Sequence, residues 1–313
     1  MSSPFPLLRL PRVVLCEVFK SLSIGEKIKL SLCSKKISAQ INIARLYSQK
    51  VIVGLDVLNE NIKVYSENIK NAFKIINCTY NGRTSDLIIQ QYRIEGHTVP
   101  VIPCPKGIIT LWKNNREGFL SVIRYLLKIF RCKFSVNCDH NSGSLQPIIS
   151  KLFDLQVEFK TLFIYLYGLK DDNLFWNQIS NKLGLVKDLS IYSLVNPGFI
   201  PVFASWPQSI FIMSSAWFTL EYLLACTCTK ISLDWSYLDN KDMDAILRKW
   251  KAGGFPNLEY LYVGSHNITK NGELILGMNP LKLRGKVIQT DDGSKKASIR
   301  IDTGFMEMSV SSV

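Results

Sequence analysis

The feature that most constrains the fold is a set of three short helical patterns at the start of the chain. The first follows Leu10 and Pro11, and its apolar residues recur at helical spacing, which places them on one face. They are Val14, Leu15, Val18, Phe19 and Leu22. Proline suits the first turn of such a helix, where its missing N–H would have had no partner. This pattern predicts an amphipathic helix.

Two more short helices are expected directly afterwards. Ser23 and Glu26 form the S-x-x-E pattern of a capping box, so a helix should begin there with Ile28 and Leu32 on its apolar face. A third apolar face is made by Ile37, Ile41 and Ala44. Three short helices bury too little surface to be stable alone. We therefore expect this unit to complete its core with a partner.

These helices resemble the F-box, a motif that docks proteins onto the Skp1 adaptor of SCF ubiquitin ligases. The opening L-R-L-P-x-V-V-L-x-x-V-F and the later L-S-L-C-S-K are similar to the form seen in nematode F-box proteins, although no aromatic residue lies between Phe19 and Tyr47, where many F-boxes carry a tryptophan. The alternative is an amphipathic hairpin packed on the rest of the protein. The resemblance implies that the adaptor contact and the small core behind it are formed by Leu8, Leu10, Pro11, Val14, Leu15, Val18, Phe19, Leu22, Ile28, Leu30 and Leu32.

Composition places the chain among globular proteins. Its 313 residues are 47% hydrophobic and 20% charged, enough for a sizeable core in one small and one large unit. No apolar run reaches the roughly 18 residues of a membrane span. Charged residues interrupt the apolar positions near the N-terminus, whereas a secretory signal has an uninterrupted apolar segment. We therefore expect a cytoplasmic or nuclear protein with eight free cysteines, no structural metal and no cofactor.

Positive charge is concentrated in the first half of the chain. Residues 1–142 hold 21 Lys/Arg and 9 Asp/Glu, whereas residues 143–313 hold 17 and 16. Residues 1–46 alone carry a net charge of +6, which would speed docking onto the acidic Skp1. The alternative is that these basic residues form a solvated surface with no specific partner. Nucleic-acid binding is less expected, because no stretch concentrates five or more Lys/Arg and no nucleic-acid motif is present.

From residue 134 onward an apolar-x-apolar triplet recurs with spacings of 28, 27, 21, 21 and 30 residues. The triplets are FSV (134–136), LFI (162–164), LSI (189–191), IFI (210–212), ISL (231–233) and LYV (261–263). Their spacing brackets the period of leucine-rich repeats, in which each unit adds one strand to a parallel sheet. The asparagine ladder of regular repeats is absent. We expect a degenerate leucine-rich-repeat-like α/β domain, with a mixed α/β domain as the alternative.

A second resemblance lies within residues 215–263. Trp217, the leucines that follow it, Trp250 and Leu258-Glu259-x-Leu261 are similar, in order and spacing, to the type 2 F-box-associated domain of nematode proteins. In those proteins the domain follows an F-box at about this distance. The expected organisation is an F-box at 1–46, a connecting α/β segment at 47–142 and an F-box-associated, repeat-like domain at 143–313.

Other local patterns predict individual elements. Residues 51–57 read as a strand, 69–76 as a helix and 99–107, with three prolines, as a turn or extended connector. Asn240 is expected to cap a helix whose Met243, Ile246, Leu247 and Trp250 face inward. The C-terminal segment 286–310 reads as a hairpin about Asp291-Asp292-Gly293, followed by a last strand.

The sequence gives no case for catalysis. It has no phosphate loop, no G-x-S-x-G and no H-E-x-x-H, and its three histidines lie far apart. In a repeat sheet, residues alternating with the buried triplet positions face outward. Six of these are aromatic or methionine, which suits contact with a protein target: Phe163, Tyr165, Tyr192, Phe211, Met213 and Tyr262. Helices covering both faces of the sheet would instead bury them, and the sequence leaves both readings open.

Together these features predict a non-catalytic substrate receptor of a Skp1–cullin–F-box ubiquitin ligase. The resemblance implies that it binds a Skp1-like adaptor, and through it a cullin, and holds an unidentified protein target. An interaction module that does not promote degradation is the alternative, and ubiquitination in a reconstituted ligase separates the two. A nucleic-acid-binding protein is the third reading, and its signature would be affinity that falls steeply with salt.

Overall fold

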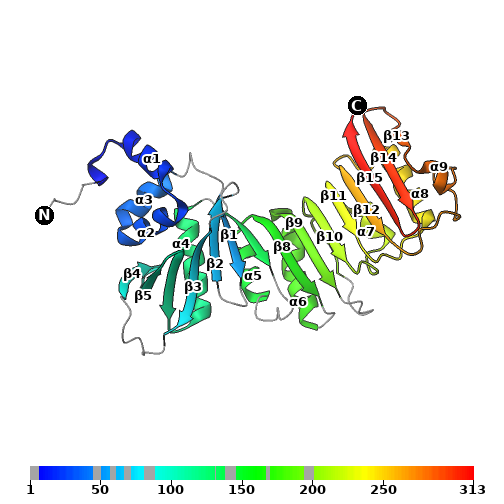
Figure 1. Cartoon of the computed structure of the whole chain (residues 1–313). Coiled ribbons are helices and arrows are strands. Elements are labelled where there is room, and N and C mark those ends of the chain that lie inside the picture. The colour runs from blue at the N-terminus through cyan, green and yellow to red at the C-terminus, as the bar shows by residue number, and fades with distance from the viewer. Residues whose placement is uncertain are drawn as a thin grey trace. The chain divides into compact units, whose positions relative to one another are not determined.

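The computed structural model describes residues 7–44, 51–56, 61–66, 72–80, 89–130, 132–137, 146–166, 170–193 and 201–313. The chain forms two compact units, residues 1–137 and 138–313, which are described separately (Figure 1). Within the described residues, no helix combines the length and hydrophobicity that a membrane crossing requires.

Unit 1 begins with the three helices expected from the sequence. They are α1 (Arg12–Ser21), α2 (Ile24–Cys33) and α3 (Lys35–Ala44), preceded by the short helix η1 (Leu7–Arg9). The capping box is confirmed, because Glu26 N donates to Ser23 Oγ at 3.2 Å and Ser23 N donates to Glu26 Oε2 at 2.8 Å. Reciprocal bonding of this kind satisfies two otherwise free N–H groups, which is why α2 starts at this point.

The rest of unit 1 is a mixed sheet with one long helix. Its strands are β1 (Val51–Asp56), β2 (Asn61–Ser66), β3 (Phe73–Thr79), β4 (Gln90–Ile94), β5 (His97–Cys104), β6 (Gly107–Trp112) and β7 (Cys132–Asn137), and its helix is α4 (Asn115–Ile129). The spatial order is β7-β1-β2-β3-β6-β5-β4. The β1–β7 and β3–β6 pairs are parallel, and the others are antiparallel.

One prediction in unit 1 was wrong and a second was right only in part. In the predicted helix at 69–76, the described part from Phe73 onward is strand β3, whose buried residues alternate with more exposed ones. The proline-rich stretch at 99–107 is extended as far as Cys104 and turns at 105–106, but its extended part is strand β5, which pairs with both β4 and β6. Pairing with neighbouring strands overrode local propensity in both segments.

Unit 2 contains a sheet of parallel strands extended by an antiparallel meander. Its strands are β8 (Phe159–Leu166), β9 (Val186–Ser193), β10 (Ser209–Met213), β11 (Lys230–Leu233), β12 (Tyr260–Gly264), β13 (Val287–Gln289), β14 (Lys295–Asp302) and β15 (Phe305–Ser312). Strands β8 to β12 are parallel and lie in chain order. β15 pairs with β12 and with β14, so the predicted C-terminal hairpin and last strand are confirmed.

All six apolar triplets are strands, and helices lie between most of the parallel ones. The helices of unit 2 are α5 (Gln146–Asp154), α6 (Lys170–Ile179), η4 (Ser180–Leu185), α7 (Leu220–Ala225), α8 (Asn240–Lys251) and α9 (Pro280–Leu283). The four inward residues predicted for α8 are all buried. Its cap was misplaced by one residue, because Asp239 forms the capping box with Asp242. Asn240 instead bonds the backbone of Thr269 through both its amide nitrogen and its amide oxygen.

Buried serines at the ends of the parallel strands tie each strand end to the next. Ser193 Oγ donates to Ser214 O at 3.0 Å, and Ser215 Oγ donates to Asp234 O at 2.9 Å. The N–H groups of Ser236 and Ser265 bond to Gly264 O and Gly304 O at 2.9 and 2.8 Å. We call Ser193, Ser215, Ser236 and Ser265 the serine ladder. It satisfies strand-end carbonyls that the sheet itself leaves unpaired.

Candidate functional site

The helices of residues 7–44 have an inner and an outer side. The predicted adaptor residues divide between them: Leu15, Phe19, Ile28 and Leu32 are buried, Leu10, Val18, Leu22 and Leu30 are half-buried, and Leu8, Pro11 and Val14 are exposed. The five apolar residues predicted for one face of α1 therefore form two rows at helical spacing. Val14, Val18 and Leu22 make the more exposed row, and Leu15 and Phe19 make the buried one.

Sequence reasoning missed the most exposed apolar residue of this region. Val13 is 76% exposed, beside Val14 at 45% and Leu8 at 41%. Val13 does not fall on the inward-facing positions of the helix, so a search for helical periodicity does not identify it as a contact residue. The available signal was the V-V pair in the resembling motif. We call Val13, Val14 and Val18 on α1, together with Leu8, Leu10 and Pro11 just before it, the outer face of α1.

The inner side of the same helices is anchored to the sheet of unit 1. A Cβ added at Gly25 would lie 2.5 Å from Cδ2 of Phe73, so α2 packs directly on β3. The hydroxyls of Ser31 on α2 and Tyr125 on α4 are 2.7 Å apart, and Asn42 on α3 donates to the carbonyl of Lys128. The helices thus have an internal partner, yet among the described residues Leu8, Pro11, Val13 and Val14 of the outer face of α1 stay exposed.

The three-helix region that carries the outer face of α1 also exposes basic residues. Arg9, Arg12, Lys35 and Lys36 are exposed in the same three-helix region. Glu26 is occupied by the capping box, and hydrogen bonds from Ser23 hold its pKa below the ordinary value. Exposed apolar and basic residues in one region suit a partner surface that is both apolar and acidic.

In unit 2 the two faces of the sheet differ. Leu162, Ile164, Leu189, Ile191, Ile210 and Ile212 are 0–2% exposed and pack beneath helices. The alternating residues are half-buried or, for Met213 at 41%, exposed. We call Phe163, Tyr165, Tyr192, Phe211, Met213 and Tyr262 the aromatic row. Its members lie on the less buried face, so they are not enclosed between two helical layers.

Neighbouring rings in the aromatic row contact one another. Tyr165 stacks on Tyr192 with centroids 5.0 Å apart, and Tyr192 meets Phe211 edge-on at 6.0 Å. Phe163 lies 6.3 Å from Tyr192. Tyr262 is separated from these by Ser232 and stacks instead on Phe305 at 6.1 Å. The structure therefore brings five of the six predicted target residues together over β8–β10 and sets Tyr262 apart.

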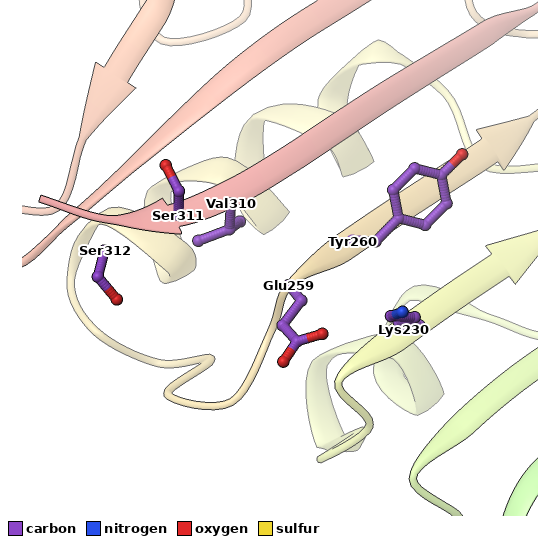
Figure 2. A pocket seen from close by; sticks show the side chains of 6 residues that line it. All are labelled: Lys230, Glu259, Tyr260, Val310, Ser311 and Ser312. Atoms are coloured by element: carbon purple, nitrogen blue, oxygen red, sulfur yellow. The ribbon is translucent and has the colours of Figure 1, made fainter.

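Two hollows lie at opposite ends of β11 and β12. The first, about 660 Å³, is bordered by Lys230 and Tyr260 at the strand starts, by Glu259, and by Val310, Ser311 and Ser312 of β15 (Figure 2). The second, about 270 Å³, lies at the strand ends and is lined by Asp234, Trp235, Tyr262 and His266, with Gly264, Ser265 and Gly304. We call the second hollow the strand-end pocket. Neither was predicted from the sequence.

The residues that carried the second resemblance mostly form structure. Trp250 is 1% exposed, and Leu223, Leu233, Leu247, Leu258 and Leu261 are all buried. Trp217 Nε1 donates to Ser193 Oγ at 2.8 Å, which ties it to the serine ladder. In the described part of the chain, no group of three His, Cys, Asp or Glu residues is placed to hold a metal ion.

Comparison with known proteins gives two domain matches. Residues 7–49 match the F-box domain, and residues 205–263 match the F-box associated family. The chain is 21% identical to an uncharacterised protein of Caenorhabditis elegans over 280 residues, which cover 85% of this chain and 62% of the relative. The chain thus spans less than two thirds of that relative's length. No solved structure matches the chain.

Proposed function

Because this chain carries an F-box domain and an F-box associated domain, as its sequence resemblances indicated, we propose that it is a substrate receptor of a Skp1–cullin–F-box ubiquitin ligase. Its F-box binds a Skp1-like adaptor, and unit 2 holds a protein target. Such a subunit performs no bond chemistry and accelerates transfer by positioning the target. The ligase acts in the cytoplasm, the nucleus or both.

One observation carries the adaptor contact: the outer face of α1 remains uncovered although α2 and α3 already pack on unit 1. Val13, Val14 and Leu8 are each more than 40% exposed. An apolar group of this kind marks a protein contact. Leu15, Phe19, Ile28 and Leu32 form the small core that holds the outer face rigid.

The target contact is supported by the aromatic row on the less buried face of unit 2. Aromatic side chains bury large areas with few rotatable bonds, and both aromatic residues and methionine are enriched at interfaces. We also infer that unit 2 is a degenerate relative of leucine-rich repeats. Its five parallel strands run in chain order, and the serine ladder takes the place that an asparagine ladder has in regular repeats.

The adaptor contact is tested with Val14→Asp in the full chain, mixed with recombinant Skp1. We expect the variant to fold and its affinity to fall about a hundredfold, because the interface would bury an unpaired carboxylate. Val287→Asp is the matched control, since Val287 is 62% exposed in unit 2. Wild-type affinity for Val14→Asp would refute the assignment of this face.

The ligase role has a separate test. The full chain is assembled with adaptor, cullin and an E2, and ubiquitination of a captured protein is followed. Transfer that depends on Val14 supports the substrate-receptor role. Adaptor binding without transfer to any captured protein would favour the interaction module that does not promote degradation.

A further inference from the structure

The strand-end pocket differs from the aromatic row because it combines aromatic rings with a carboxylate. Asp234 follows β11, Tyr262 is on β12, and Trp235 and His266 lie on the loops after those strands. A Cβ added at Gly264 would be 3.2 Å from Asp234 Oδ1 and 3.2 Å from the Tyr262 hydroxyl. Both oxygens therefore converge on the space that this glycine leaves open.

The backbone of this pocket is held firmly. Asp234 N donates to Ile212 O at 2.9 Å, and its carbonyl accepts from Ser215 N at 2.8 Å. Ser236 N donates to Gly264 O at 2.9 Å, which joins the loop after β11 to the end of β12. These bonds hold the backbone from which the Asp234 and Trp235 side chains project, so the frame of the pocket is preorganised for a ligand.

Trp235 occupies a conformation that its side chain does not favour. Its φ is +55°, in the left-handed region where Gly, Asn and Asp are the usual residues. The side chain is nevertheless 62% exposed, and its ring meets His266 edge-on at 5.5 Å. Ser214, after the neighbouring strand β10, has a similar φ of +58° with a small side chain. Strain combined with exposure of a large ring is typical of ligand contacts.

The carboxylate of Asp234 is the second unusual feature. No ion pair to it is found among the described residues, and burial raises its pKa above the ordinary value. A partly desolvated carboxylate costs stability unless a cation meets it. Aromatic faces beside a carboxylate favour a cationic group, and the same sheet already shows such a contact, with the Arg300 guanidinium 5.4 Å from the Phe305 ring.

We propose that the strand-end pocket takes one lysine or arginine side chain of the protein target. The cation meets the Asp234 carboxylate and the Tyr262 hydroxyl, and the aliphatic stem lies along Trp235. At about 270 Å³ the pocket fits a single side chain, below the usual range for cofactors and drug-sized ligands. This inference rests on the proposed function only for the statement that the ligand belongs to a protein target.

The test uses the full chain labelled with 5-fluorotryptophan, with the Trp235 resonance assigned from Trp235→Phe. Blocked lysine and arginine (Nα-acetyl amides) are the probes, and blocked norleucine and glutamine are the uncharged controls. We expect a saturable shift of the Trp235 signal with lysine or arginine, about tenfold weaker with norleucine. Asp234→Asn keeps the shape of the pocket and should weaken binding of the cation by about tenfold.

Three results would overturn the proposal: no shift with either cation, equal response to norleucine, or unchanged binding by Asp234→Asn. Since no adaptor or ligase is present, this outcome is independent of the Val14→Asp experiment. Thermal unfolding of Asp234→Asn serves as the folding control. We expect it to be as stable as wild type, because the change removes a partly desolvated charge.

Discussion

The Tyr125 hydroxyl lies 2.7 Å from the Ser31 hydroxyl and joins α4 to α2 of the F-box. Ser31 Oγ also bonds to Ile28 O at 2.7 Å, so the serine donates to its own helix and accepts from the tyrosine. Through this contact and the packing of Gly25 on Phe73, the F-box is part of unit 1 and not a separate appendage. One face of the motif is thereby fixed, while the outer face of α1 stays available.

The Tyr125–Ser31 contact predicts a pH dependence. Burial raises the pKa of Tyr125 to about 12. In the unfolded chain this phenol ionises near its ordinary value of about 10. Between these values the folded state binds more protons than the unfolded state, so stability should fall as pH rises from about 10 to about 12.

The measurement is urea unfolding of wild type and Tyr125→Phe between pH 8 and pH 11.5. At pH 8 the variant should be about 1 kcal/mol less stable, because it loses one hydrogen bond. Above pH 10 its stability should fall less steeply than that of wild type. If the stability of the two proteins fell in parallel with pH, the pKa of Tyr125 would not be raised by folding.

A second prediction concerns how closely α2 packs on the sheet. Gly25→Ala places a methyl group 2.5 Å from the Phe73 ring, so the helix or the ring must move. We expect a loss of about 1–3 kcal/mol in urea unfolding. Gly184→Ala is the matched control, because nothing lies within 4 Å of its added Cβ, and it should be neutral or slightly stabilising. Equal effects of the two changes would contradict the close packing.

A third prediction concerns the serine ladder. Ser193→Ala removes the acceptor of the Trp217 indole N–H at 2.8 Å and the donor to Ser214 O. Loss of bonds to buried groups should cost about 1–3 kcal/mol, measured by chemical denaturation. Ser298→Ala, at an exposed position of β14, should change stability by less than about 0.5 kcal/mol. If Ser193→Ala lowered the free energy of unfolding no more than this control, the serine ladder would not stabilise the sheet.

A fourth prediction separates surface from core in unit 2. The triple variant Phe163→Ser, Tyr192→Ser and Phe211→Ser should remain folded with a reduced melting temperature, because the helix-covered face is untouched. Its capture of the protein target should be lost. Ile191→Ser, at a residue 0% exposed, should cost about 3–4 kcal/mol by leaving a cavity and burying a hydroxyl. Unfolding of the triple variant, seen by circular dichroism, would instead make the aromatic row part of the core.

The sequence by itself determined the elements whose signals are local. Ser23 and Glu26 start α2 because a capping box needs only four consecutive residues, its two ends included. The six apolar triplets became strands because their alternation holds regardless of which neighbour they pair with. Both domain resemblances were also legible in the sequence, since they depend on residue order alone.

Tertiary structure decided what depends on distant neighbours. Phe73 belongs to a strand because β2 and β6 flank it, although its local spacing also suits a helix. Val13 and Leu15 differ in exposure because α3 packs against one side of α1. Asp234, Trp235, Tyr262 and His266 form a pocket because parallel strands bring their ends together from segments about thirty residues apart. Burial and convergence are properties of packing between segments, and a one-dimensional pattern does not specify them.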